Sequence, residues 1–104
     1  MTGIDIVDLK RVPLQDSFLK RILTEKEMKE YMRLSGTQRR REYAGGRFAC
    51  KEAIFKATQD PDYLHYSILH GENGRPYVED HPEIEISISH DGGIAAAVVL
   101  IRTE

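Results

Sequence analysis

The sequence has 104 residues, of which 40% are hydrophobic and 31% are charged, so it can form one small domain with a thin core over residues 1–104. This composition is typical of globular proteins and argues against disordered, collagen-like or coiled-coil sequences. The net charge of −2 conceals an uneven distribution: residues 1–58 have 13 Lys and Arg against 8 Asp and Glu, whereas residues 59–104 have 2 against 9. We therefore exclude a uniformly basic nucleic-acid coat and expect a basic face for an anionic partner.

The single cysteine, Cys50, excludes a disulfide within the chain and a cage of thiolate ligands. The longest apolar run, residues 94–101, is too short to span a bilayer. The first residues lack the basic and apolar regions of a secretory signal peptide. We expect a cytoplasmic protein with no membrane partner.

The first half of the chain predicts a strand followed by helices. Residues 3–9 alternate as in a strand and place Asp5 on the same face as two apolar side chains. A helical turn is expected at residues 17–22. Thr24 and Glu27 form a capping box, which predicts a helix of about eleven residues ending near residues 35–36. Residues 37–58 predict a longer helix with a stripe of small residues suited to close packing.

The second half predicts antiparallel strands. Residues 66–69 and 76–78 flank Asn-Gly, the strongest short hairpin signal. Residues 84–90 alternate with three isoleucines on the core face, and residues 94–101 are typical of a strand buried on both faces. The order of one strand, two to three helices and then an antiparallel meander predicts the α+β class.

Two acidic residues stand among apolar neighbours. Asp5 lies in the first strand, and Glu52 follows Phe48 by four residues and so borders the aromatic stripe of the long helix. Ionised carboxylates are costly to bury without a cation, and Mg²⁺ prefers such oxygen ligands. Two ordinary interpretations remain open: Glu52 and Lys56 form a surface i,i+4 pair, or Asp5 faces solvent at a sheet edge.

Three further features have both structural and functional interpretations. Ser87, Ser89 and His90 form a polar strand end, because neither their spacing nor any nucleophile elbow provides a catalytic triad. The arginines at positions 39–41 form a solvated helix start whose charge opposes the helix dipole, which hints at an anionic partner. Cys50 is interpreted as a small core residue.

Taken in order, these segments resemble the holo-acyl-carrier-protein synthase family of 4′-phosphopantetheinyl transferases. The motifs that match are G-I-D-I-V at 3–7, R-I-L-T at 21–24 followed by Glu27, A-G-G-R-F-A-C-K-E-A-I-F-K-A at 44–57, N-G-R-P-Y at 73–77, I-S-I-S-H at 86–90 and A-A-A-V-V at 95–99. The motif of the long helix is specific, and the match covers most of the chain.

The resemblance implies the fold of these transferases and transfer of phosphopantetheine from coenzyme A to a serine of apo acyl carrier protein, in support of fatty acid biosynthesis. It implies that Asp5 and Glu52 bind Mg²⁺ and that Lys56 lies beside the phosphates of coenzyme A. Glu52 or a metal-bound water would deprotonate the serine. The residues that match the coenzyme A pocket are Arg47, Gly74, Arg75, Pro76, Ser89 and His90.

The resemblance also implies partners. Arg11 and Arg21 match basic positions that meet the acidic carrier protein, and family members are typically homotrimers with active sites shared between subunits. Residues 57–66 are shorter than in the family and lack its G-T-G loop, and Arg75 replaces a lysine. Two other functions are weighed against this one: a nucleic-acid-binding module that uses the arginines, and a relative that binds coenzyme A or a carrier without turnover.

Overall fold

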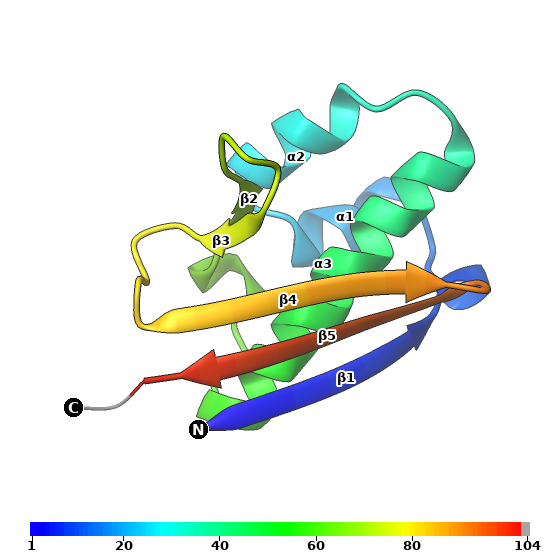
Figure 1. Ribbon diagram of the computed structural model, residues 1–104. Coiled ribbons are helices and arrows are strands. Elements are labelled where there is room, and N and C mark those ends of the chain that lie inside the picture. The colour runs from blue at the N-terminus through cyan, green and yellow to red at the C-terminus, as the bar shows by residue number, and fades with distance from the viewer. Residues whose placement is uncertain (103–104) are drawn as a thin grey trace.

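A computed structural model of the chain describes residues 1–102 (Figure 1). Strand β1 (Thr2–Asp8) is followed by a 3₁₀ turn, and helices α1 (Asp16–Ile22), α2 (Glu25–Met32) and α3 (Thr37–Thr58) come next. A second 3₁₀ turn precedes strands β2 (Ile68–His70), β3 (Pro76–Val78), β4 (Ile84–Asp91) and β5 (Ile94–Ile101). The two 3₁₀ turns are η1 (Leu9–Arg11) and η2 (Tyr63–His65). This order confirms the α+β class.

The strands form two antiparallel sheets. The larger has the order β1-β5-β4, with Asp5 of β1 opposite Ala97 of β5. Strands β2 and β3 form a separate hairpin, with His70 opposite Pro76. The predicted single meander is therefore wrong, and the pairing of β1 with β5 was not predicted. Local alternation marks a strand but does not say which distant strand it pairs with.

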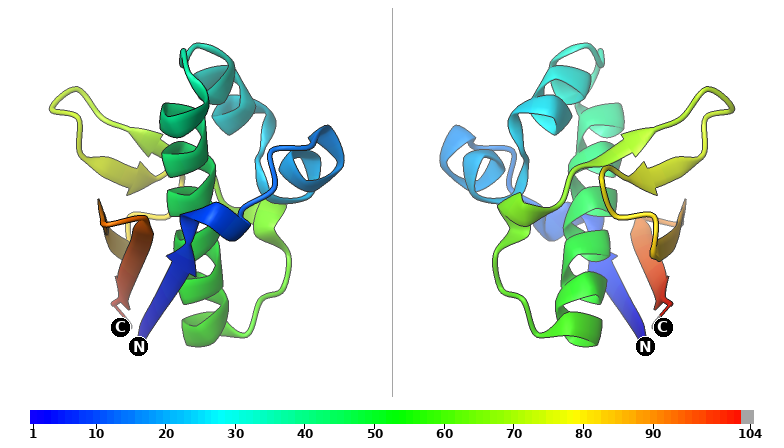
Figure 2. Two further views of the ribbon diagram at one scale, coloured as in Figure 1. Left: turned by 90° about the vertical axis from the view of Figure 1, so that its right-hand side faces the viewer. Right: turned by 90° about the vertical axis from the view of Figure 1, so that its left-hand side faces the viewer.

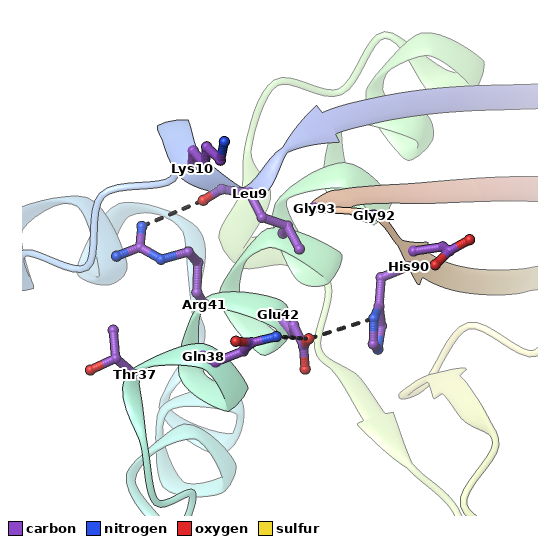
Figure 3. A pocket seen from close by; sticks show the side chains of 10 residues that line it. Leu9, Lys10, Thr37, Gln38, Arg41, Glu42, His90, Gly92 and Gly93 are labelled. Carbon is purple, nitrogen blue, oxygen red and sulfur yellow. Dashed lines mark hydrogen bonds and ion pairs between the residues drawn. The ribbon is translucent and has the colours of Figure 1, made fainter.

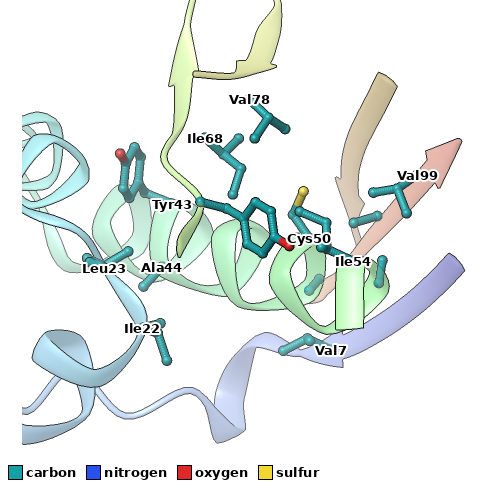
Figure 4. Close-up of a cluster of buried hydrophobic side chains, with 14 of the residues drawn as sticks. Val7, Ile22, Leu23, Tyr43, Ala44, Cys50, Ile54, Ile68, Val78 and Val99 are labelled. Carbon is teal, nitrogen blue, oxygen red and sulfur yellow. The ribbon is translucent and has the colours of Figure 1, made fainter. Parts of the chain in front are cut away.

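Helix α3 lies between the larger sheet on one side and α1 and α2 on the other (Figure 2). It approaches β1 so closely that a Cβ at Gly3 would lie 2.0 Å from the carbonyl oxygen of Ala53. Ala49 and Ala53 have no exposed surface, which confirms the predicted stripe of small residues. The core continues from this helix to α1 and the β2–β3 hairpin (Figure 4). The short distance between α3 and β1 fixes the relative position of their carboxylates.

Helix α2 begins at the predicted capping box and ends earlier than predicted. Thr24 accepts from the backbone N–H of Glu27, whose side chain accepts from the N–H of Thr24. The helix has 8 residues and stops at Met32, not near residues 35–36. Arg40 of α3 donates to the carbonyl oxygens of Met32 and Leu34, so the last turn is satisfied by a side chain. That contact is formed only after α3 folds back.

Strand β5 is buried on one face, which corrects the prediction that both faces are covered. Its side chains alternate between the core and solvent, and Val98 and Leu100 are 44% and 47% exposed. Helix α3 covers the inner face, and no element of residues 1–102 covers the outer one (Figure 2). Ile4 and Ile6 of β1, 61% and 66% exposed, continue this apolar face.

No helix within residues 1–102 combines the length and the hydropathy needed to cross a bilayer.

Candidate active site

Asp5 and Glu52 come together beside one cavity, although they belong to different elements. Asp5 lies on the face of β1 that packs on α3, and Glu52 lies on α3 facing the same space. The cavity has a volume of about 660 Å³, and Arg11, Phe18 and Phe48 also line it. The side chain of Asp5 is only 17% exposed. The alternative in which Asp5 faces solvent at a sheet edge is therefore wrong.

Lys56 pairs with Asp5. Its ammonium group donates to Asp5 Oδ1 and to the carbonyl oxygen of Ile4, each at 3.0 Å. The predicted surface pair would join Lys56 to Glu52, but Lys56 reaches across to β1 instead. A half-exposed cation therefore balances the carboxylate of Asp5.

Two carboxylates and a cavity fit a divalent cation only in part. Among residues 1–102, no cluster of three or more His, Cys, Asp or Glu side chains is placed to hold a metal ion. Mg²⁺ commonly takes one or two carboxylates and completes its coordination with water and substrate phosphates. The ammonium group of Lys56 already occupies the cation position beside Asp5 Oδ1. The donor set thus suits Mg²⁺ when a phosphate ligand is also bound.

Tyr63 is a residue near this site that the sequence did not indicate. Burial first, and then the carboxylates of Glu52 and Asp5, raise its pKa to about 12. The ring packs edge to face on Phe48, with centroids 6.1 Å apart, and Phe48 packs in the same way on Phe18 at 5.5 Å. Tyr63 belongs to η2, within residues 57–66. This segment therefore places a tyrosine beside Glu52.

A second cavity, of about 340 Å³, brings together four of the predicted coenzyme A residues. Arg47 of α3, Gly74 and Pro76 of the β2–β3 hairpin, and His90 of β4 all line it. Arg39 and His70 line it as well and were not predicted. It shares no lining residue with the cavity of Asp5 and Glu52.

Three predicted coenzyme A residues do not line this second cavity. Ser89 alternates with His90 along β4 and lies on the outer face of the sheet. Arg75 is exposed in the hairpin loop, and Lys56 is at the first cavity. Within one chain the predicted binding residues therefore divide into separate groups.

The guanidinium group of Arg47 is held by protein groups. The side chain is 5% exposed, Nε donates to the carbonyl oxygen of Ile68 at 3.2 Å, and Cζ lies 3.9 Å from the ring centroid of Tyr43. Nη2 lies 3.3 Å from His70 Nδ1 and 3.6 Å from Glu30 Oε1. Arg47 therefore joins α3 to β2 and α2 underneath the cavity.

The arginine run at the start of α3 has divided roles. Arg41 donates to the carbonyl oxygens of Val12, at 2.6 Å, and Leu9, and Arg40 holds the end of α2. Figure 3 shows Arg41 beside a third cavity of about 680 Å³, where Glu42 lies 3.7 Å from His90. Only Arg39 is free to face the second cavity. The structure thus uses two of the three arginines to fasten neighbouring elements.

The remaining predicted residues are placed as follows. Arg11 lies at the first cavity, and exposed Arg21 is 5.9 Å from the ring centroid of Phe18 on α1. Cys50 has no exposed surface, and burial raises the pKa of its thiol to about 12, which confirms it as a core residue.

The fold is a small α+β domain in which two acidic side chains, from β1 and α3, line one cavity. Residues 1–99 match the 4′-phosphopantetheinyl transferase superfamily. The chain is 40% identical to the holo-[acyl-carrier-protein] synthase of Halalkalibacterium halodurans, over 97% of this chain and 93% of that protein. The corresponding protein of Listeria innocua is also 40% identical, over 96% of this chain and 95% of its own length.

Solved structures of holo-[acyl-carrier-protein] synthases are similar to this fold. The Bacillus anthracis holo-(acyl-carrier-protein) synthase in complex with CoA (3′,5′-ADP) superposes with a TM-score of 0.87, at 34% identity over 99% of this chain and 96% of that chain. The Helicobacter pylori enzyme in complex with coenzyme A gives 0.80, at 28% identity over 98% and 100%. The chain belongs to the 4′-phosphopantetheinyl transferase superfamily.

Proposed function

We propose that this protein transfers 4′-phosphopantetheine from coenzyme A to a serine of apo acyl carrier protein, as holo-[acyl-carrier-protein] synthases do, and so supports fatty acid biosynthesis in the cytoplasm. The observation that carries the proposal is the cavity shared by Asp5 and Glu52, in a chain similar over nearly its full length to such synthases. The serine oxygen forms a bond to the phosphorus that bears pantetheine. The bond from that phosphorus to the bridging oxygen breaks, and adenosine 3′,5′-bisphosphate leaves.

Each side chain at the first cavity has a role in this reaction. Asp5 and Glu52 would hold Mg²⁺, which when bound neutralises charge on the pyrophosphate and on the leaving group. The Lys56 ammonium group, at 3.0 Å from Asp5, lies where it can turn to the same phosphates. Glu52 accepts the serine proton, directly or through a water molecule. The phenyl rings of Phe18 and Phe48 give the same cavity an apolar side.

The nucleotide of coenzyme A belongs in the second cavity, with Arg47, Gly74, Pro76 and His90, while Arg75 and Ser89 border the cofactor from their own elements. Arg11 and Arg21 face the carrier protein, since both are exposed near the first cavity or on adjacent α1. Opposite charge would steer an acidic carrier toward them.

A homotrimer with active sites at its subunit interfaces would bring together the predicted binding residues that lie apart in one chain. The outer face of the sheet carries Ile4, Ile6, Val98 and Leu100, and large exposed apolar patches mark interaction surfaces. The two cavities of one chain share no residue, so the acids of one subunit would work with the nucleotide cavity of its neighbour. Ser89, on that outer face, would then lie at the interface.

The test is the mass of an apo acyl carrier protein incubated with this protein, coenzyme A and Mg²⁺. We expect a gain of one phosphopantetheine, lost on addition of a chelator. Asp5→Asn and Glu52→Gln should each lower kcat by at least about a hundredfold, because each removes one oxygen ligand of the proposed ion.

Glu25→Gln, which changes an exposed acid on α2, is the matched control and should keep full activity. A wild-type protein that binds coenzyme A without modifying any apo carrier would contradict the transferase and favour the binding-only relative. Wild-type rates in either acid variant, with chelator present, would refute the metal assignment.

A further inference from the structure

His70 is the last residue of β2 and lies at the base of the hairpin that carries Gly74 and Pro76. Its side chain is 45% exposed and lines the second cavity with Arg39, Arg47 and His90. Its backbone N–H donates to Glu30 Oε2 at 3.3 Å, and the ring lies 6.4 Å from that of Tyr43. The imidazole therefore packs on Tyr43 on one side, is nearly half exposed and lines the cavity.

The contact with Arg47 determines which ring nitrogen carries the proton. A guanidinium group can only donate, so the 3.3 Å contact from Arg47 Nη2 requires a lone pair on His70 Nδ1. Arg47 cannot turn away, because its Nε is bonded to the carbonyl oxygen of Ile68 and its plane packs on Tyr43. A neutral His70 with an unprotonated Nδ1 carries its proton on Nε2.

Glu30 does not reverse this assignment. Its Oε1 is 3.7 Å from His70 Nδ1, farther than Arg47, and it already accepts a hydrogen bond from the Tyr43 hydroxyl at 2.7 Å. Burial and the Arg47 guanidinium both lower the pKa of His70, so the ring is neutral near pH 7. The Nε2–H donor then belongs to a ring that is 45% exposed and lines the cavity.

We propose that His70 binds the adenine nucleotide of coenzyme A through Nε2–H, and that Arg47 acts as a positioning residue that fixes the tautomer of His70. This inference rests on the proposed function and adds to it one binding residue and a role for a buried arginine. The nucleotide is rich in hydrogen-bond acceptors, so an N–H donor suits it. Arg39 and His90, which also carry N–H groups, line the same cavity. The phosphopantetheine half of coenzyme A would lie with Asp5 and Glu52, which line a separate cavity.

Two variants distinguish the effect of the hydrogen-bond donor on binding from the effect of the ring shape. His70→Phe keeps a planar ring and removes the donor, whereas His70→Gln supplies an N–H₂ donor close to the position of Nε2. Binding of adenosine 3′,5′-bisphosphate and of coenzyme A is measured by calorimetry on the full-length protein, with circular dichroism as the check on folding. We expect about a tenfold loss of affinity for both ligands in His70→Phe and recovery of most of it in His70→Gln.

Three further measurements distinguish nucleotide binding from a structural effect. Binding of 4′-phosphopantetheine alone should be unchanged in His70→Phe. The KM for coenzyme A should rise about tenfold with kcat unchanged, since the loss is in uniform binding. The ¹⁵N shifts of the imidazole at pH 7 should show a proton on Nε2 and none on Nδ1.

Equal losses for 4′-phosphopantetheine, an unchanged affinity for the nucleotide, or a proton on Nδ1 would each overturn the inference while leaving the transferase proposal intact. A wild-type protein that neither binds coenzyme A nor modifies a carrier would overturn both.

Discussion

Lys51, which precedes Glu52 on α3, forms an ion pair with Glu27 of α2, and neither side chain has exposed surface. The ammonium group of Lys51 donates to Glu27 Oε1 and to the last carbonyl of α1, at Ile22. Glu27 Oε2 accepts from the backbone N–H of Ile68 at 2.8 Å. These two side chains therefore connect α1, α2, α3 and β2.

The first prediction is that Lys51→Met lowers the free energy of unfolding by about 3–5 kcal/mol, because it leaves the Glu27 carboxylate buried without a cation. Urea unfolding at a fixed protein concentration measures the change. Lys26→Met, which breaks the exposed pair with Glu79, is the matched control and should leave the midpoint nearly unchanged. A loss no larger than that of the control would contradict the structural role of the pair.

The sequence identified some of the buried or partly buried charged residues and missed others. Asp5 and Glu52 could be singled out because each interrupts an apolar pattern, and a resemblance to a family supported them. Glu27 was recognised as part of a capping box and of a family motif but not as a buried charge, and Lys51 was not singled out. A capping glutamate is ordinarily exposed, and its burial depends on β2 folding over α2 from 41 positions along the chain. The local sequence pattern around Glu27 does not indicate such a long-range contact.

At the scale of elements, the segment between α3 and β2 contains a short turn held by its own side chains. His65 Nδ1 lies 2.7 Å from Asp60 Oδ2, and Nε2 lies 3.0 Å from Asp62 Oδ2. Asp60 also accepts from the hydroxyl of Tyr66 at 2.9 Å, and Asp62 caps η2 by accepting from the N–H of Leu64. This network holds the segment that places Tyr63 beside Glu52.

The turn should be most stable at pH values at which Asp60 is ionised and His65 is protonated. The His65 ring and two hydrogen bonds lower the pKa of Asp60 from 3.8 to about 2, so its contribution is present above pH 3.8 and is lost as pH falls through about 2. Hydrogen bonding to Asp60 raises the pKa of His65 above 6.5, so its contribution is present below pH 6.5 and is lost as pH rises through the raised value.

We therefore expect hydrogen-exchange protection of the Leu64 and Asp62 amides, corrected for intrinsic rates, to be highest between pH 3.8 and 6.5. His65→Gln should remove the decline on the alkaline side and keep the one on the acid side. Protection that is independent of pH in the wild-type protein would show that the ion pairs do not hold the turn.

Element prediction succeeded where the signal was local. Helix α3 begins and ends at the predicted residues, Thr37 and Thr58, and the hairpin forms around Asn73-Gly74. Helix α2 ended early because a side chain of α3 satisfies its last carbonyls. Strand β5 was wrongly taken as buried on both faces, because an apolar sequence is the same whether a second layer of this chain or another molecule covers it.

For the whole molecule, the outer face of the sheet is the surface on which assembly would depend. We predict that wild-type protein sediments as a trimer and that Ile6→Asp dissociates it and abolishes transfer, because a carboxylate replaces one of the most exposed apolar side chains of the face. Met32→Asp, at an equally exposed position on α2, is the control and should change neither property.

Sedimentation velocity together with the carrier mass assay tests this prediction. A monomeric wild-type protein with full activity would contradict the shared site, and so would a trimer in Ile6→Asp. The sequence could name both acids of the first cavity and four residues of the second, since each of these lies in a recognisable motif. The sequence could not show that the predicted binding residues lie in separate places on one chain. Ser89 and His90, for example, are adjacent in one motif but lie on opposite faces of the sheet.

The ion pair between Lys56 and Asp5 bears on how folding is linked to metal binding. A protein that relies on a cation to neutralise its buried carboxylates is unfolded by a chelator, as small zinc domains are. Here the half-exposed ammonium group of Lys56 balances Asp5, so the chain needs no metal ion to neutralise this carboxylate when it folds. If Asp5 and Glu52 bind Mg²⁺ as proposed, the ion would compete with Lys56 for Asp5, and Lys56 would then be available to the substrate phosphates. We therefore expect a chelator to leave the protein folded under conditions in which it stops the proposed transfer.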